Sequence, residues 1–262
     1  MDLELKGKHV LVTGGSRGIG LACALEFLRE GARVTLVGRS RGNMDQALAQ
    51  LRQAGFTATG CCADLADAAE ALRAVDEAEA AGGPIEILVN SAGAARRTPF
   101  DELQPQDWHD AMQAKFFTYI HVLDPVVRRM GARGAGAIVN VVGMGGKVAS
   151  PTHLAGGAAN AALMLASAGL AAAWGARGVR VNAVNPAMTQ TERVAQGLAA
   201  DARLRNTTPE EVLRQAQAKM PLGRMATAEE VAAAVVFLAS PRASYISGAV
   251  LSMDGAATPM IV

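Results

Sequence analysis

The stretch Val10-Leu11-Val12-Thr13-Gly14-Gly15-Ser16-Arg17-Gly18-Ile19-Gly20 decides the fold of this chain. A short apolar run with strand character leads into glycines, and a segment of helical period follows. Glycines at such a turn let backbone N–H groups approach a pyrophosphate, and the helix N-terminus adds partial positive charge. The stretch therefore predicts a βα unit that binds a dinucleotide through Gly14, Ser16, Arg17, Gly18, Ile19 and Gly20.

Apolar runs and helical segments alternate along the rest of the chain, which indicates βαβ units and a parallel sheet. We predict an α/β fold class: one doubly wound, Rossmann-type sheet of about seven parallel strands with helices on both faces. Residues 1–262 are expected to form a single domain. The predicted strands are 9–13, 33–37, 57–61, 85–90, 137–142, 179–184 and 249–252, and the predicted helices are 19–30, 43–54, 66–81, 106–133, 152–174, 209–219 and 228–239.

The segment 186–222 interrupts this alternation with Pro186, two threonines and an irregular polar helix. An insertion after the carboxyl end of a strand is where a substrate lid is expected. The alternative is a surface excursion without a function.

Composition narrows the class of protein. The net charge of +1 gives no long-range field that would recruit nucleic acid or an anionic membrane. The cysteines, Cys23, Cys61 and Cys62, are too few for a disulfide framework and match no zinc spacing, so we expect free thiols, a cytoplasmic protein and no metal site. Residues 148–176 lack Lys, Arg, Asp and Glu, but their Ala and Gly content favours a buried helix over a membrane span.

The second predicted strand ends in Gly38-Arg39-Ser40-Arg41. NAD-binding proteins usually carry an acidic residue at this position, and none is present. Arg39, together with Arg17, is suited to pair with a 2′-phosphate. NADP(H) is therefore favoured over NAD(H), the alternative being that both arginines are solvated surface charges.

Several further motifs follow in order: Asp64-Leu65, Asn90-Ser91-Ala92-Gly93, Arg180-Val181-Asn182, Asn185-Pro186, Pro221-Leu222-Gly223-Arg224 and Asp254-Gly255. Through them and the glycine loop, the chain resembles a short-chain dehydrogenase/reductase over nearly its whole length. The resemblance implies that Asp64 and Leu65 border the adenine. It also implies that Asn90, Ala92 and Gly93 support the ribose, and that Pro186 and Thr191 flank the nicotinamide.

The resemblance further implies a catalytic tyrosine, a lysine four positions later, a serine and an asparagine. The chain has only Tyr119 and Tyr245, and the fourth residue beyond each is Leu123 and Ala249. The chain is therefore predicted to be a divergent member without the usual catalytic residues. The alignment used here places His153 at the tyrosine, Gly157 at the lysine, Gly143 at the serine and Lys115 at the asparagine.

His153 and Lys115 are the candidate catalytic residues. Imidazole ordinarily titrates near pH ~6.5, so it can exchange a proton near neutrality. An ammonium group beside it would favour the neutral, basic form and hence alcohol oxidation over ketone reduction. The structural alternatives are a local backbone bond at a helix start for His153, and a snorkelling side chain for Lys115.

Three functions remain open at this point. The first is an oxidoreductase with an altered active site, acting on an apolar alcohol or ketone. The second is an inactive NADP(H)-binding homologue that serves as a regulatory or structural subunit, and the third is a non-redox lyase or isomerase. By resemblance we expect a homotetramer or homodimer, or a hetero-oligomer with an active relative under the second reading.

Overall fold

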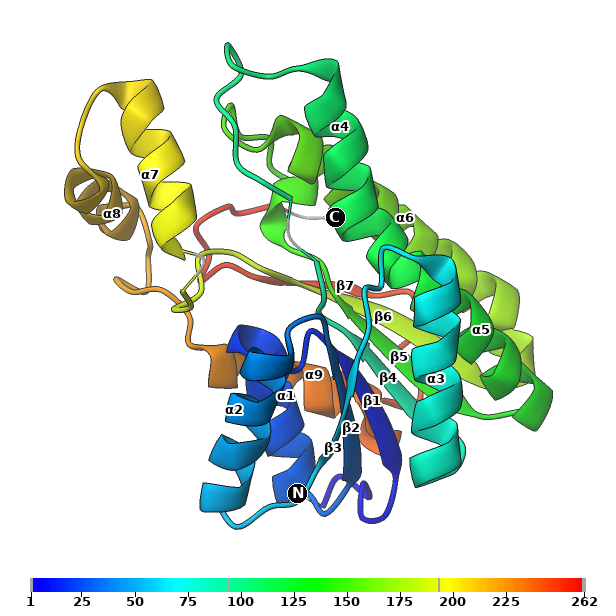
Figure 1. The fold of residues 1–262 in the computed structure, drawn as a ribbon. Helices are drawn as coiled ribbons and strands as arrows, with labels where there is room; N and C mark the ends of the chain where they lie inside the picture. Colours follow the sequence, from blue (N-terminus) through cyan, green and yellow to red (C-terminus); the bar gives the residue numbers. More distant parts are fainter. Residues whose placement is uncertain (1, 94, 193, 261–262) are drawn as a thin grey trace.

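The computed structural model describes residues 2–93, 95–192 and 194–260. Seven parallel strands form one sheet in the order β3-β2-β1-β4-β5-β6-β7, as Figure 1 shows. This architecture confirms the predicted α/β fold class. The strands are β1 (His9–Thr13), β2 (Arg33–Gly38), β3 (Thr59–Cys62), β4 (Ile87–Asn90), β5 (Gly136–Val141), β6 (Val179–Pro186) and β7 (Val250–Met253).

Helices cover both faces of the sheet because each central strand is apolar on both sides (Figure 1). One face carries α1 (Gly18–Arg29), α2 (Arg41–Gln53) and α9 (Ala228–Ala239). The other carries α3 (Ala68–Gly82), α5 (Thr118–Arg133) and α6 (Leu154–Trp174). The two apolar layers position the carboxyl ends of all strands along a single edge.

The helix predicted at 106–133 is divided in the structure. It consists of α4 (Pro105–Ala111), a π-helical segment η1 (Met112–Phe117) and α5. A π turn widens the helix locally and shifts the direction of the side chains it carries. Hydrophobic periodicity could not reveal this widening, because the apolar pattern runs through it without interruption.

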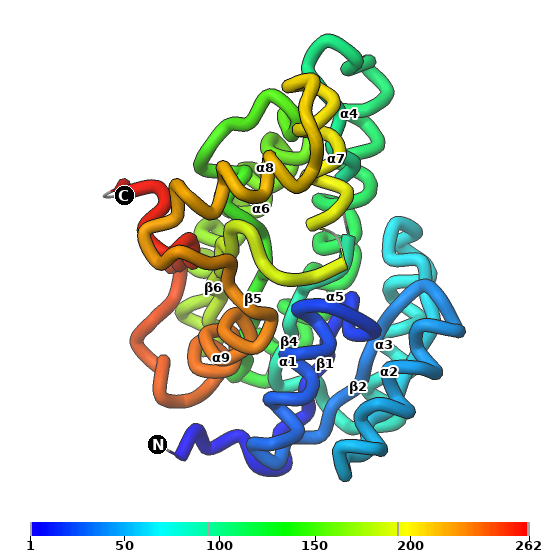
Figure 2. Tube along the Cα trace, turned by 90° about the vertical axis from the view of Figure 1, so that its left-hand side faces the viewer, coloured from blue at the N-terminus to red at the C-terminus, as the bar shows by residue number. Residues whose placement is uncertain are grey.

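The segment between β6 and α9 contains two helices, α7 (Val194–Arg205) and α8 (Pro209–Ala218). They pack on each other through Leu198, Ala202 and Val212. Figure 2 shows the pair beyond the ends of the strands, at the opposite end of the molecule from the N-terminus. The helix predicted at 209–219 is therefore present, and α7 is an additional one. Residue 193 of the predicted lid lies outside the described residues.

Within the described ranges, Leu154–Arg177 is the one helical segment long and apolar enough to span a membrane. In this structure the helix packs against β6, and Ala155, Ala159 and Leu163 are buried. A core helix of an α/β fold has the same length and composition.

A buried polar network fastens the centre of the sheet to α6. The hydroxyl of Thr13 donates to the side-chain Oδ1 of Asn90 at 3.2 Å, and the side-chain amide of Asn90 donates to the Oδ1 of Asn140 at 3.0 Å. Asn140 in turn donates to the hydroxyl of Ser167 on α6 at 2.9 Å. Each of these side chains is essentially inaccessible to water, so each bond replaces solvation that the buried group has lost.

We predict that Asn140→Ala lowers the free energy of unfolding by about 3 kcal/mol, because it leaves Asn90 and Ser167 buried with fewer partners. Urea denaturation would measure the change. Gln50→Ala, at an exposed position of α2, is the control and should change stability by less than about 0.5 kcal/mol. A loss for Asn140→Ala as small as that of the control would contradict the proposed importance of the network.

Candidate active site

A cavity of about 460 Å³ opens at the carboxyl ends of β4, β5 and β6. Its walls come from the loops after these strands, from the start of α6 and from α7. In open α/β sheets, ligands bind at this edge. Among the lining residues are Ile19, Gly93, Lys115, Gly143, His153, Gly156, Asn160, Pro186 and Thr191.

The glycine loop fits a bound phosphate. Gly14 and Gly18 have φ values of +64° and +55°, a backbone region that favours glycine. A Cβ on Gly20 would lie 2.2 Å from the Gly14 carbonyl oxygen, so this glycine is required for the turn to close on the helix. Helix α1 begins at Gly18, and its N-cap residue Arg17 makes no side-chain hydrogen bond to it. The first turn of α1 therefore keeps its N–H groups available for an anion.

Two arginines lie at the same edge as the glycine loop. Ser16 packs over Gly38 at the end of β2, which brings Arg17 and Arg39 onto neighbouring segments. Arg17 lies 3.6 Å from the carboxylate of Glu192, in a pair exposed to solvent. For Arg39, no carboxylate oxygen of residues 2–93, 95–192 or 194–260 lies within 4.0 Å. This exposed guanidinium is available to a ligand.

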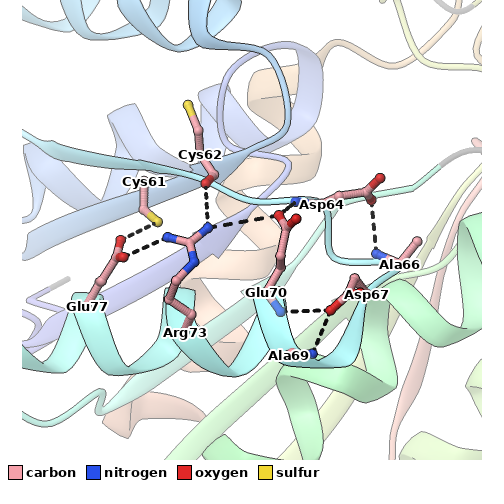
Figure 3. Close-up of polar contacts among 9 residues, drawn as sticks. All are labelled: Cys61, Cys62, Asp64, Ala66, Asp67, Ala69, Glu70, Arg73 and Glu77. Carbon is pink, nitrogen blue, oxygen red and sulfur yellow. Dashed lines mark hydrogen bonds and ion pairs between the residues drawn. The ribbon is translucent and has the colours of Figure 1, made fainter.

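Figure 3 shows the turn between β3 and α3 with Asp64, and Leu65 follows Asp64 in the same turn. The backbone N–H of Asp64 donates to Glu70 at 2.8 Å, and its carboxylate accepts the N–H of Ala66 at 3.1 Å. Leu65 is buried, and its carbonyl accepts a hydrogen bond from His121. These bonds fix the conformation of the turn before any ligand binds.

The cysteines beside this turn are free thiols. Burial and the neighbouring Glu77 carboxylate raise the pKa of Cys61 to about 11, and its thiol donates to that carboxylate (Figure 3). Such a group remains a thiol near neutral pH and is a poor nucleophile. In the part of the chain that the structure describes, no three His, Cys, Asp or Glu side chains gather as metal ligands would.

Some residues at the ends of β4 and β6 hold the loops in place, and others line the cavity. Asn90 is buried in the polar network, so it positions the loop rather than facing the cavity. Gly93 has φ +89° and lines the cavity close to the Ala114 carbonyl, where a Cβ would not fit. The hydroxyl of Thr13 accepts the N–H of Ala92 and so orders the start of this loop. Pro186 and Thr191 both line the cavity, and Thr191 lies opposite Gly18.

The imidazole of His153 occupies a particular space in the cavity. A Cβ built on Gly156 would lie 2.1 Å from Cε1 and 2.7 Å from Nδ1 of this ring. The ring therefore stands where a side chain at position 156 would begin. Glycine at 156 is what allows His153 to fill that place.

Gly157, which the sequence alignment placed at the family's lysine, does not line the cavity. A Cβ at 157 would lie 2.7 Å from the Gly145 carbonyl oxygen, so this position faces packed backbone and does not line the cavity. The two positions four residues apart that do line it are Gly156 and Asn160. The pair 156 and 160 lies three residues beyond the pair 153 and 157 that the sequence alignment used.

Asn160 was missed by the sequence analysis. It is 5% exposed, and its carbonyl oxygen has no hydrogen-bond partner among the described residues. Its amide nitrogen lies 3.4 Å from where a Cβ on Gly143 would be. The available signal was that Asn160 is the sole amide side chain in an α6 made almost wholly of small and apolar residues. A buried polar atom in this state calls for a ligand or a water.

Lys115 lies on the π-helical segment and is only 8% exposed, which excludes the snorkelling alternative. Its ammonium donates to the hydroxyl of Tyr119 at 2.8 Å and to the Val141 carbonyl at 3.1 Å. Tyr119 is fully buried behind it and does not line the cavity. The structure therefore brings Lys115 and His153, from different elements, into one cavity wall.

Comparison with known proteins places this site in a family. A family model described as "Enoyl-(Acyl carrier protein) reductase" matches residues 14–258. A D-threitol dehydrogenase from Mycolicibacterium smegmatis is 38% identical over 260 residues, which cover 98% of this chain and 95% of the relative. The chain belongs to the short-chain dehydrogenase/reductase family.

Two solved structures share its fold closely. One is a gluconate 5-dehydrogenase from Burkholderia cenocepacia in complex with NADP and tartrate, with 32% identity, a TM-score of 0.88, and coverage of 99% of this chain and 98% of that one. The other is a 7α-hydroxysteroid dehydrogenase in complex with NADH and a 7-oxo bile acid, with 28% identity, a TM-score of 0.86, and coverage of 97% and 95%. By their names, these relatives are dehydrogenases of threitol, of gluconate and of a hydroxysteroid.

The two neighbouring glycines at the start of α6 give a matched test of the site geometry. We predict that Gly157→Ala lowers the free energy of unfolding by about 2 kcal/mol, because the new methyl meets backbone. Gly156→Ala should cost less, since its methyl meets the movable His153 ring and the Ala95 methyl group rather than backbone, but it should shift the His153 ring signals in NMR spectra. The exposed His109 provides an unshifted reference. Equal stability losses and an unmoved His153 would contradict this geometry.

Proposed function

We propose that this chain is an NADP(H)-dependent oxidoreductase that interconverts an alcohol and a ketone with His153 and Lys115 as its catalytic residues. One observation carries the proposal: the His153 ring stands where the side chain of residue 156 would lie, in the same cavity as the Lys115 ammonium. The family membership and the glycine loop support a redox reaction over the lyase and isomerase alternatives.

The substitutions proposed for the active site are related to one another. With positions 156 and 160 in the places that the family gives to tyrosine and lysine, the chain has glycine and asparagine there. Lys115 in turn stands where the resemblance implies asparagine. A lysine and an asparagine have thus exchanged helices, which keeps one ammonium and one amide in the cavity. Gly143 leaves the serine hydroxyl unreplaced.

The residues present support proton transfer beside a hydride transfer. A bound nicotinamide would supply the hydride acceptor for the carbinol carbon, or the hydride donor for the carbonyl carbon. In the oxidation direction, the imidazole of His153 accepts the hydroxyl proton as the C–H bond breaks, so the alcohol becomes a ketone. The Lys115 ammonium stabilises negative charge that develops on the oxygen. The side-chain Oδ1 of Asn160, which has no hydrogen-bond partner among the described residues, can accept a hydrogen bond from a hydroxyl of a bound molecule.

Preference for NADP(H) is supported by Arg17 and Arg39, in the absence of an acidic residue after β2. The relatives do not decide it, since one solved structure holds NADP and another NADH. Charge-assisted hydrogen bonds from a guanidinium fork to a 2′-phosphate are the physical basis of the proposed preference.

The segment 186–222 is proposed as the lid. Met188, Val194 and Leu198 line the cavity or the core of this segment, and they offer an apolar surface to the body of a substrate. We also propose a homodimer or homotetramer, because Leu165 on α6 is 78% exposed and Trp108 and Phe117 are exposed on the adjoining helix.

Replacing the imidazole tests the proposed reaction. His153→Ala is predicted to reduce kcat at least about tenfold, as expected for loss of a general acid or base, and to leave NADPH affinity within about twofold. Steady-state assays on alcohols and ketones, with fluorescence titration of NADPH, would measure both. Undiminished turnover would remove His153 from the mechanism. NADPH binding by the wild-type chain with no turnover would favour the inactive subunit, and turnover without cofactor would favour a lyase or isomerase.

Cofactor preference has its own test. Arg39→Ala is predicted to weaken NADPH binding by about 10- to 100-fold, the value of one or two charge-assisted hydrogen bonds, and to leave NADH binding unchanged. Calorimetric titration with both cofactors would measure this. Arg52→Ala, at an exposed position on α2, is the matched control and should change neither affinity. Equal losses for NADPH and NADH would contradict a contact with the 2′-phosphate.

A further inference from the structure

Arg97 is a cation on the cavity wall that the proposed reaction does not use. It lies on the segment between β4 and α4 and is half-buried. A Cβ on Gly197, in the first turn of α7, would lie 3.0 Å from its Nε and 3.2 Å from its Cδ. Because residue 197 has no side chain, the Arg97 guanidinium packs directly against α7, which belongs to the proposed lid.

The acidic residues of the cavity are occupied elsewhere. Asp201 accepts a hydrogen bond from the Thr152 hydroxyl, and Asp254 accepts the backbone N–H groups of Ala256 and Thr258. Counting only residues that the structure describes, no carboxylate oxygen lies within 4.0 Å of the Arg97 guanidinium. The neighbouring Arg96 is exposed and lines a separate hollow of about 170 Å³ instead.

Arg97 is half-buried as a residue, and its guanidinium forms no ion pair with the described carboxylates, so it can pair with a ligand. Its planar fork of donors matches a carboxylate in bidentate geometry. The cavity also holds the Lys115 ammonium, and the two carboxylates of Asp201 and Asp254 balance these two positive charges. Recognition of an anionic ligand therefore rests on the donor fork of Arg97 and not on the net charge of the cavity.

We propose that the substrate is a hydroxy acid, or the corresponding keto acid, whose carboxylate pairs with Arg97 while its hydroxyl or carbonyl lies at His153. This inference rests on the proposed function for the identity of the reacting group, but the carboxylate site stands on Arg97 alone. The apolar residues of the cavity then contact the carbon chain between the two polar ends.

The test compares hydroxy acids with diols in which a CH₂OH group replaces the carboxylate. The probes are 3-hydroxybutanoate, 4-hydroxypentanoate and 5-hydroxyhexanoate against 1,3-butanediol, 1,4-pentanediol and 1,5-hexanediol, with the protein saturated with NADP⁺. For at least one chain length, kcat/KM for the hydroxy acid should exceed that for its diol about tenfold or more, chiefly through KM. The same acid should raise the Tm of the NADP⁺ complex, and its diol should not.

Variants connect this preference to one side chain. Arg97→Gln should bring the ratio of acid to diol close to one and abolish the Tm shift, and Arg97→Lys should retain part of both. Gly197→Ala should lower the ratio as well, because the added methyl displaces the guanidinium while alanine favours the helix. Arg96→Gln should keep the wild-type ratio.

The outcomes separate this inference from the proposed function. If diols and hydroxy acids turn over equally well and Arg97→Gln keeps that ratio, the redox function stands and the carboxylate site is overturned. If no compound turns over but a hydroxy acid raises Tm only when Arg97 is present, the site stands and the redox function fails. If no hydroxy acid raises Tm or shows a preference, the inference is overturned.

Discussion

The candidate site depends on a chain of buried hydrogen bonds from Thr13 through Asn90 and Asn140 to Ser167. These four side chains join the carboxyl ends of three strands to the helix that carries the cavity wall. Parallel strands with apolar side chains on both faces would allow several positions for α6, because small alanines pack almost equally well in each. The polar network selects one of them, and with it the positions of His153 and Asn160.

The proposed catalytic imidazole reaches the cavity because a small residue, Gly156, leaves space beside it. Gly156 leaves a space that an imidazole fills from the preceding turn, and the π-helical segment directs Lys115 toward the same cavity. The ammonium is held by the hydroxyl of Tyr119 and by a backbone carbonyl, both of which are uncharged. The ammonium lies in the cavity wall, where it can stabilise negative charge on an oxygen of a bound molecule.

The sequence predicted the fold class, all seven strands and the dinucleotide loop, since these depend on local periodicity and on glycines at one turn. The sequence did not indicate which positions at the start of α6 line the cavity, because Leu154 to Ala162 offers no periodic contrast between its faces. Asn160 and Arg97 were missed for a related reason. Neither belongs to a recognisable motif, and each gains its meaning from distant partners: the β5 loop in one case and Gly197 in the other.

The polar network also constrains how this protein can fold. Its three bonds join residues 77, 50 and 27 positions apart, so none of them forms within one helix or one βα unit. Loop-closure entropy makes such contacts late events relative to local structure. A chain emerging from the ribosome can form its first βα units early. It can complete the cavity at the carboxyl ends of the strands only after residue 167 has been synthesised and α6 has packed on the sheet.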